Sequence, residues 1–354
     1  MTHYAVVPAN LDKDKQVILD LWRRNLADTN HLEERFNWQF LNSPFGRGQI
    51  WILEADGQPI GTTSLSMRPL KLRDTLTTAG VAGDLAVNKG HRFLQPALML
   101  QRALISSADP GVRILYGLPN PAGASVMKYV GYREFCCVHR YAKVLRLSHY
   151  LKRFGKFGAV VPFIGGVADR GFSALQSFGT RNGKRVTQVL HCFDERFDEL
   201  WSRLNLEHPT WTVRDQRFLK WRYCECPIRR YKTLALLTQD ESTLLGYLIY
   251  YVEEQSAVCS DLVAGSGADD LNCLLSSWAA LAFGDGLASL SFACPDGALA
   301  ANLEQHGFTR RSTSPALKPN GTRPHEHSKT LFTHERTNPP LAEDWYYTEG
   351  DTVF

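Results

Sequence analysis

A short basic segment between a predicted strand and a predicted helix is the part of this sequence best suited to chemistry. The apolar run 80–87 (GVAGDLAV) predicts a strand, and the apolar spacing that follows Pro96 predicts a helix. Lys89, His91 and Arg92 lie between the two, and no acidic residue occurs among them or in the helix. Because the first N–H groups of a helix have no partner within it, this junction could bind an anion such as a phosphate. A plain turn with solvated charges is the alternative.

A second pattern follows at a fixed distance along the chain. Asn120 is followed by Gly123, Met127 and the pair Gly131-Tyr132 at intervals of three, seven and eleven residues. Together with the basic segment, this pattern resembles the GNAT superfamily of acyl-CoA N-acyltransferases, in which Asn-x-x-Ala is followed by Tyr and then Gly-Phe. Asn120, Gly123 and Gly131-Tyr132 stand at the matching positions. The resemblance covers most of residues 1–145 and, more weakly, 186–354.

The basic segment matches the phosphate loop of that family with one departure. The family pattern is Arg/Gln-x-x-Gly-x-Gly/Ala, and this chain reads Arg92-x-x-Gln95-x-Ala97. Gln95 adds a side chain where glycine lets the backbone approach a pyrophosphate closely, although its N–H remains available. The resemblance implies that residues 92–97 hold the pyrophosphate of coenzyme A.

The resemblance also implies the fold class, which is α+β. Each of two acyl-CoA N-acyltransferase-like domains would be a mixed, mostly antiparallel sheet with a splayed central strand pair, flanked by helices. The pantetheine arm of acetyl-CoA or another acyl-CoA would lie in the split, paired like an extra strand with the backbone of residues 85–87. The cofactor-binding residues that the resemblance implies are Leu85, Ala86, Val87, Arg92, Phe93, Leu94, Gln95, Ala97, Leu98 and Asn120.

In the reaction that the resemblance implies, an amine attacks the thioester directly, without a metal. The protein must deprotonate the amine, stabilise the oxyanion and protonate or release the thiolate. Asp84 is the carboxylate closest to the expected split and is the candidate base; an ion pair with a neighbouring Arg or Lys is the alternative role. Met127 occupies the position where many family members carry a tyrosine thought to protonate the thiolate. Tyr129 is the candidate replacement, and Tyr116 is the other tyrosine considered.

The chain repeats one plan twice. Residues 36–44 (FNWQFLNSP) and 219–227 (LKWRYCECP) share the pattern apolar-x-Trp-x-aromatic-x-x-small-Pro at an offset of 183. Two further pairs, Leu21-Trp22 with Leu200-Trp201 and Gly131-Tyr132 with Gly307-Phe308, lie at offsets of 179 and 176. Offsets this similar indicate a duplication.

Each copy is expected to contain about six strands and three or four helices. Strands 232–238 and 244–252 of the second copy are expected to form a hairpin like that of the first copy. In the first copy, Pro96 is expected as the first residue of the helix that follows the basic segment, because a missing N–H is tolerated there. The elements expected in the first copy besides this helix are strands at 49–55, 59–67, 80–87 and 112–118, a short helix ending near residue 130 and a pair of strands within 132–145.

The second copy is less suited to bind coenzyme A. Its strand 257–263 leads into a helix near Ala268, with Asp269 and Asp270 in the first turn. Acids there favour the helix dipole and repel a pyrophosphate. We therefore expect a degenerate domain that shapes the acceptor cleft or a dimer contact; an active site in the second copy is the alternative.

The expected organisation is an acyl-CoA-binding domain at 1–145, a helical linker at 146–185 and the degenerate domain at 186–354. The linker is expected to pack between the domains, with a membrane-surface helix as the alternative. Tandem proteins of this type often close with a Gly-Asp like Gly350-Asp351, which implies a cleft contact from Asp351.

Composition excludes several classes of protein. The 354 residues are 44% hydrophobic and 21% charged, as in globular proteins, and a net charge of +4 without a concentrated basic face predicts no nucleic-acid partner. The N-terminus lacks the apolar core of a signal peptide, and the weakly polar run 158–168 is shorter than the ~20 residues of a membrane span. The cytoplasm is the predicted location. The cysteines lack paired spacing, and His325, His327 and His334 are expected in a polar loop, so no metal site is predicted.

The predicted function is transfer of an acyl group, with acetyl as the first choice, from acyl-CoA to a small-molecule or sugar amine. A non-catalytic binding or scaffold protein of the same fold is one alternative. A transferase that uses aminoacyl-tRNA is the other, and the balanced charge counts against it. A homodimer and a weak membrane-surface contact through 146–185 are compatible with the sequence.

Overall fold

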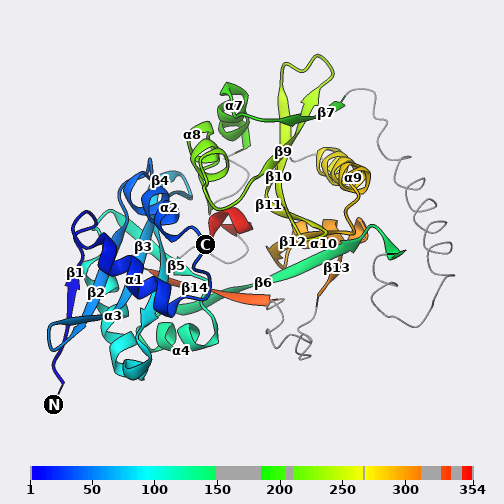
Figure 1. Cartoon of the computed structure of the whole chain (residues 1–354). Coiled ribbons are helices and arrows are strands. Elements are labelled where there is room, and N and C mark those ends of the chain that lie inside the picture. Colours follow the sequence, from blue (N-terminus) through cyan, green and yellow to red (C-terminus); the bar gives the residue numbers. More distant parts are fainter. Residues whose placement is uncertain are drawn as a thin grey trace.

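One mixed β-sheet runs through both halves of the molecule (Figure 1). The computed structural model describes residues 2–148, 185–204, 210–265, 268–311, 328–335 and 345–352. In this part of the chain, fifteen strands form one sheet, with the main order β1-β2-β3-β4-β5-β14-β6-β12-β11-β10-β9-β7. The predicted α+β class, with a mixed sheet and flanking helices, is confirmed. The predicted linker lies almost wholly outside the described residues.

The first half supplies six strands and covers both faces of its part of the sheet with helices. Its strands are β1 (Tyr4–Pro8), β2 (Gln49–Ala55), β3 (Gln58–Leu72), β4 (Thr75–Val87), β5 (Val112–Gly117) and β6 (Arg133–Val144). Its helices are α1 (Lys15–Asn25), α2 (Leu32–Phe36), the π-helical turn η1 (Asn37–Leu41), the 3₁₀ turn η2 (Lys89–His91), α3 (Leu94–Ser107) and α4 (Pro121–Tyr129).

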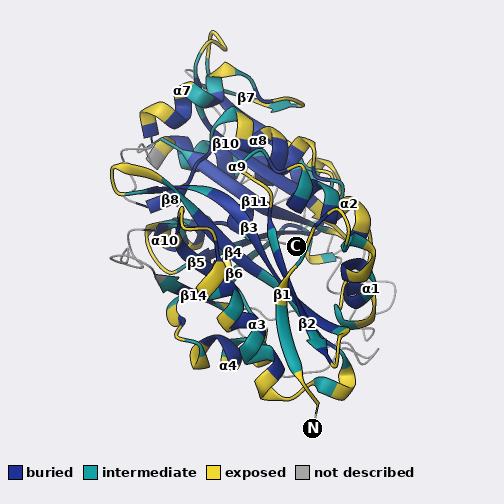
Figure 2. Ribbon diagram, turned by 90° about the vertical axis from the view of Figure 1, so that its left-hand side faces the viewer, coloured by how far each residue is buried: buried dark blue, intermediate teal, exposed yellow. Residues whose placement is uncertain are grey.

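The alternation of side chains along β2 divides the core of this half into two layers. Ile50 and Ile52 pack with α1 on one face, whereas Trp51 and Leu53 pack with α3 on the other. Both sets are buried. The central strands are therefore covered on both sides, and exposed residues gather on the outer surfaces of the helices and in the turns (Figure 2).

The second half repeats this order of elements. Its strands are β7 (Arg185–Leu190), β8 (Thr210–Thr212), β9 (Lys232–Thr238), β10 (Leu244–Glu253), β11 (Ser256–Ala264), β12 (Ser289–Pro295), β13 (Thr309–Arg310), β14 (Ser328–Glu335) and β15 (Trp345–Tyr346). Its helices are α7 (Glu195–Leu204), α8 (Gln216–Leu219), the π-helical turn η3 (Lys220–Cys224), α9 (Ala268–Gly284), α10 (Ala298–Gln305) and the 3₁₀ turn η5 (Glu349–Asp351).

The two halves exchange strands at the centre of the sheet. β14 comes from the second half but lies between β5 and β6, and β6 pairs on its other edge with β12 (Figure 1). The prediction of two paired strands within 132–145 is therefore wrong, since this segment forms the single strand β6. The segment contains no Gly, Pro, Asn or Asp to make a tight turn, so it continues straight from one half into the other.

Two other elements of the first half differ from the prediction. β3 continues beyond the predicted end at residue 67 because its last residues, from Leu70 to Leu72, pair with β8 of the second half. α3 begins at Leu94, so Pro96 is its third residue and not its first. Proline is tolerated throughout the first turn because no N–H there has a partner within the helix.

A pair of tryptophans joins the halves through equivalent contacts. The rings of Trp38 and Trp221 stack with their centroids 4.7 Å apart and their planes at 18°. Trp38 Nε1 donates to the carbonyl of Trp221 at 2.9 Å, and Trp221 Nε1 donates to the carbonyl of Trp38 at 3.3 Å. Such reciprocal bonds are typical of a contact across a two-fold axis. The two segments matched in the sequence therefore meet each other in the fold.

Among the described residues, the helices are all too short or too polar to cross a membrane.

The tryptophan pair makes a testable contribution to stability. Trp221 is 1% exposed, so Trp221→Ala should leave a cavity between the halves and lower the free energy of unfolding by about 3–5 kcal/mol in urea denaturation. Leu76, which is 69% exposed, provides the control, because Leu76→Ala should change that free energy by no more than about 0.5 kcal/mol. Similar effects of the two substitutions would contradict the role of the pair.

Candidate functional site

The first half contains a split between two parallel strands. β4 and β5 are paired from Thr78 with Val112 to Val81 with Tyr116, and no further. β4 then continues to Val87, whereas β5 ends at Gly117. Within the described residues, no strand pairs with the last six residues of β4 on the β5 side.

A β-bulge bends β4 inside this split. The pairing of β3 with β4 shifts so that Asp84 and Leu85 together lie opposite Thr63. Asp84 has a φ of 47°, in the left-handed region where Asp is one of the more tolerated side chains. A bulge of this kind redirects the strand and its hydrogen-bonding groups. It therefore sets the direction of the unpaired edge of β4.

The carboxylate of Asp84 is held by two donors. Arg35 Nη2 donates to one oxygen and the Ser64 hydroxyl to the other, both at 2.8 Å. The Asp84 side chain is only 4% exposed, and the guanidinium of Arg35 lies over the ring of Trp22. Asp84 is thus close to the split, as predicted, and also makes the ion pair that was its alternative role. Arg35 and Ser64 are not among the site residues predicted from the sequence.

The predicted pantetheine edge has its hydrogen-bonding groups directed into the split. The N–H of Asn88 bonds to Ile60 on β3, and such bonds alternate along a regular antiparallel strand, so Val87 presents its N–H and C=O groups to the other side. Ala86 instead faces β3. One of the groups in the split is already used, because the carbonyl of Val87 accepts from Arg92 Nε at 2.8 Å.

A short loop that contains the 3₁₀ turn η2 connects this edge to the start of α3. No side chain caps this helix, whose first residues are Leu94 and Gln95, and Pro96 has no N–H to offer. Phe93 and Leu94 are 49% and 45% exposed, large values for apolar side chains, and Gln95 is also exposed. Ala97 and Leu98 are half-buried on the helix. The helix start is therefore open to solvent and to an anion.

Arg92 braces this loop. Besides its bond to Val87, its guanidinium donates to Asn25 Oδ1 at 3.0 Å, and Asn25 donates in turn to Asn88 at 2.8 Å. The side chain predicted to bind the pyrophosphate thus ties the loop to α1 and to the end of β4.

The predicted residues on α4 occupy different surroundings. Asn120 caps the helix, because its Oδ1 accepts from the N–H of Gly123 at 2.9 Å, which accounts for their spacing. Met127 is buried, and a Cβ built on Gly117 would lie 3.0 Å from its Cε, so it packs at the end of β5. Tyr129 lies at the far end of α4 and is 67% exposed. Two helical positions point about 200° apart, so the side chain of Tyr129 is directed away from the face on which Met127 packs at the end of β5.

Tyr116 lies on the other face of the sheet. It is fully buried, and its hydroxyl donates to the carbonyl of Asp351 at 2.7 Å. Burial raises the pKa of Tyr116 above its ordinary value. This tyrosine therefore contacts the C-terminal segment (residues 345–352) and is a poor proton donor at neutral pH.

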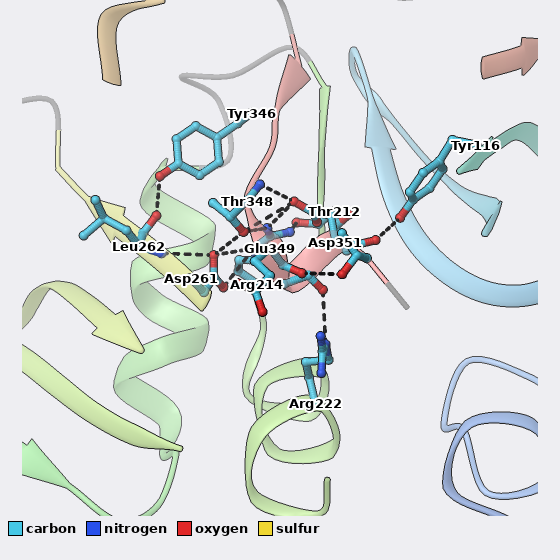
Figure 3. Close-up of polar contacts among 12 residues, drawn as sticks. Tyr116, Thr212, Arg214, Arg222, Asp261, Leu262, Tyr346, Thr348, Glu349 and Asp351 are labelled. Atoms are coloured by element: carbon cyan, nitrogen blue, oxygen red, sulfur yellow. Dashed lines mark hydrogen bonds and ion pairs between the residues drawn. The ribbon is translucent and has the colours of Figure 1, made fainter. Parts of the chain in front are cut away.

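The second half has the same split, and side chains of the C-terminal segment bond to the β11 side of it. β11 and β12 are paired only from Ser256 with Ser289 to Val258 with Ser291. Beyond this point Tyr346 donates to the carbonyl of Leu262 on β11, and Thr348 donates to Asp261 Oδ1 at 3.0 Å (Figure 3). The segment thus bonds to the strand that corresponds to β4.

A buried ion triad holds this segment in place. Arg214 lies 3.1 Å from Asp261 and 2.9 Å from Asp351, and all three side chains are at most 1% exposed (Figure 3). Burial opposes the charge on Arg214, but the two carboxylates together keep its pKa well above the ordinary value. Burial raises the pKa of Asp261, and Arg214 counteracts this. Asp351, for which the sequence suggested a cleft contact, is held in this buried triad, and its carbonyl accepts from Tyr116 of the first half.

The helix start in the second half is also occupied. Asp270 is the third residue of α9, and its Oδ1 lies 2.6 Å from Arg185 Nε on β7. A Cβ built on Gly265 would lie 3.0 Å from the other oxygen of Asp270. The carboxylate therefore lies against the loop where the first half leaves space for an anion.

Asp84 and Asp261 occupy equivalent positions in the two copies. Asp261 also lies at a bulge, since β10 pairs with β11 through Ile249 with Asp261 and then Tyr250 with Cys259. Each carboxylate binds one arginine, and hydroxyl groups complete its partners: Ser64 at Asp84, and Thr348 and Tyr247 at Asp261. The matching strings 83–87 (GDLAV) and 260–264 (SDLVA) could have revealed this pair, at an offset of 177.

Within the described ranges, no group of three or more His, Cys, Asp or Glu side chains could hold a metal ion. His334 lies on β14 rather than in a loop, and His325 and His327 lie outside those ranges.

Comparison with known proteins supports the fold at low sequence identity. No model of a known protein family matches the sequence, and no curated protein matches it significantly. A probable N-acyltransferase of unknown function from Enterococcus faecalis V583 is 11% identical with a TM-score of 0.64, covering 95% of this chain and 73% of that one. A GCN5-related N-acetyltransferase from Anabaena variabilis ATCC 29413 is 10% identical with a TM-score of 0.62, covering 94% and 72%.

A tandem protein is also similar along its whole length. The tandem GNAT protein from the clavulanic acid biosynthesis pathway is 15% identical with a TM-score of 0.55, and the match covers 96% of this chain and 100% of that one. The chain therefore has the fold that these acetyltransferase-like structures share.

The triad predicts a large cost for releasing the C-terminal segment. Asp351→Asn removes one carboxylate from a fully buried arginine and should lower the free energy of unfolding by about 3–5 kcal/mol in urea denaturation. The exposed pair Lys15–Glu33 is the control, and Lys15→Ala should cost less than about 1 kcal/mol. An Asp351→Asn protein as stable as the parent would show that the triad does not hold the segment.

Proposed function

We propose that this chain, which has the fold of the GCN5-related N-acetyltransferases, transfers an acyl group from acyl-CoA to an amine, with acetyl as the first choice. The observation that carries the proposal is the split in the first half. There, an unpaired strand edge at 85–87 leads to an uncapped and solvent-open helix start at 94–95. An extended arm with amide groups can pair with the edge, and a pyrophosphate can bind at the helix start.

The departure at Gln95 is compatible with this ligand. Its side chain is exposed and so leaves the space above the helix start free. Its N–H is in the first turn of α3, where no bond within the helix uses it. In the second half the corresponding strand edge bonds to Tyr346, and Asp270 lies at the helix start, which supports one acyl-CoA site per chain.

The coenzyme would supply an activated thioester, and the chain would orient it. A C–N bond forms between the amine nitrogen and the acyl carbon, the C–S bond breaks with its electron pair on sulfur, and the amine proton passes to water. Leu85 and Val87 would align the arm through their backbone groups. Met127 has no proton to give, so we place no acid at that position. A thiol has a pKa of about 8.5 and leaves as a thiolate with little assistance.

We assign Asp84 a positioning role. Its two oxygens are bonded to Arg35 and Ser64, and the same arrangement recurs at Asp261 in the second half. A carboxylate retained in the half where Tyr346 bonds to the strand edge and Asp270 lies at the helix start supports a function in holding the bulge. The role of Asp84 as a base is the competing prediction.

A transfer assay tests the proposal directly. Purified protein should release free thiol from acetyl-CoA only in the presence of some amines in a panel of amino acids, amino sugars and polyamines, and mass spectrometry should find the acylated product. Binding of acetyl-CoA without transfer to any amine would favour the non-catalytic alternative.

A charge placed at the helix start should weaken binding. Gln95→Glu puts a carboxylate where Asp270 blocks the second half, and it should weaken acetyl-CoA binding about tenfold or more in calorimetry, which corresponds to about 1.4 kcal/mol. Ser106→Glu, which adds the same charge at the exposed opposite end of α3, is the matched control and should bind like the parent. Equal affinities of the Gln95→Glu and Ser106→Glu proteins for acetyl-CoA would show that the ligand does not bind at this helix start.

The two roles of Asp84 predict different kinetics. Asp84→Asn keeps the tolerance for positive φ but loses the ion pair, so for a positioning role acetyl-CoA affinity and kcat/KM should both fall about tenfold or more with an unchanged pH profile. Asp56→Asn, at an exposed turn with φ of 49°, is the control. If binding is unchanged and the acidic limb of the kcat profile disappears, Asp84 is the base.

A further inference from the structure

A cavity of about 380 Å³ lies in the second half, where the start of β9 meets the end of β10. The two strands are neighbours there, since Lys232 pairs with Tyr250. The cavity is lined by residues 228–232, which lead into β9, and by Tyr251 and Val252 on β10. Its volume is at the lower end of the range of small-molecule sites, which is about 300–1,000 Å³. A small ligand therefore has room here, outside both splits.

Part of the lining is apolar and aromatic. The rings of Tyr231 and Tyr251 meet edge to face, with their centroids 5.7 Å apart and their planes at 84°. Val252 is 44% exposed, a large value for an apolar side chain, and Ile228 is half-buried. A ligand with an apolar body would cover surface that is now in contact with water.

Arg229 presents a guanidinium that is held in place. It lies over the ring of Tyr251 at 4.3 Å, and its Nη1 donates to Glu349 at 2.8 Å. Glu349 also accepts from the Tyr251 hydroxyl at 3.1 Å, so the ring and the carboxylate fix the guanidinium together. The Arg229 side chain remains 31% exposed and lines the cavity. A planar guanidinium is a surface on which a flat ring can stack.

The charges of the lining leave one positive charge in excess. Arg229 forms an ion pair with Glu349, and Lys232 forms one with Asp285 at 3.0 Å. Arg230 is exposed and makes no ion pair with any described residue. Glu253, the next residue on β10, is exposed and does not line the cavity. The excess of one charge suits a monoanion, and a guanidinium can bind a carboxylate through two parallel hydrogen bonds.

We propose that this cavity binds an aromatic carboxylate, with the ring against Arg229 and Val252 and the carboxylate bound by Arg230. The inference goes beyond the proposed function, because the cavity includes no residue of β4, β5 or α3 and its occupation does not require acyl-CoA. Through Glu349 the site also adjoins the C-terminal segment.

The test compares three probes of similar shape by calorimetry. 2-Naphthoate has the ring and the charge, 2-naphthamide lacks the charge, and decahydro-2-naphthoate keeps the charge but lacks the flat ring. Naphthoate should bind about tenfold or more tightly than either of the others. Its affinity should be the same with and without saturating acetyl-CoA, since the two ligands occupy different places.

Substitutions in the lining make the test specific to this cavity. Arg230→Met should abolish the preference for naphthoate over naphthamide, and Val252→Glu should weaken naphthoate binding about tenfold or more. Both side chains are exposed, so both variants should fold. Arg229→Lys keeps a cation beside Glu349 and should reduce the preference for the flat ring. Arg113→Met, at an exposed arginine on β5, is the control and should bind naphthoate like the parent.

The outcomes decide the inference independently of acyl transfer. Equal binding of naphthoate and naphthamide, no binding of naphthoate at millimolar concentration, a preference that survives Arg230→Met, or displacement of naphthoate by acetyl-CoA would overturn it. Binding that prefers naphthoate and depends on Arg230 and Val252 would support it, even if no amine is acylated and the proposed function fails.

Discussion

The contact of Arg214 with Asp261 and Asp351 holds the C-terminal segment against the second half of this molecule. It fixes the C-terminal segment in the split of the second half, where Tyr346 and Thr348 bond to β11. Three fully buried charges are stable together only if each is well bonded, so the segment cannot leave without a large cost. In the described part of the chain, the C-terminal segment therefore bonds to the strand edge of one split, whereas no strand pairs with the corresponding edge of β4.

Duplication and divergence are visible in the same local design. Both halves have a parallel pair that separates, a bulge with an aspartate, and an arginine bound to that aspartate. They differ in what covers the strand edge and the helix start, where the second half has Tyr346 and Asp270. The halves are held together by the Trp38–Trp221 pair and by the strand β14, which the second half adds between two strands of the first. The part of the sheet in the first half is therefore incomplete without the second half.

Much of this architecture could be predicted from the sequence because it depends on local patterns. Turn residues between successive strands, such as Asp56-Gly57, predicted the hairpins, and the repeated tryptophan segments predicted the duplication. The position of β14 and the length of β6 could not be predicted, because they depend on pairing between segments nearly 200 residues apart. Pro96 was placed two residues off, since proline tolerates any position in a first turn.

The backbone segments of the candidate site were predicted from the sequence, but the side chains that bind Asp84 were not. Residues 85–87 and the start of α3 were identified from the resemblance, and the structure brings them together at one split. Arg35 and Ser64 were missed because an ion pair across the fold leaves no periodic signal in a sequence. A sequence does not place a hydroxyl group, and Tyr129, the candidate replacement for Met127, is exposed where Met127 is buried because two helical positions point about 200° apart.

Hydrogen exchange with and without acetyl-CoA tests the central claim, which is that, of two copied splits, the first is open to acyl-CoA and the second is held by the C-terminal segment. We expect slow exchange at 345–352 in the free protein. On addition of acetyl-CoA, we expect new protection from exchange at 83–97 and no change at 257–270. Protection at 257–270, or release of 345–352 when acetyl-CoA binds, would contradict it.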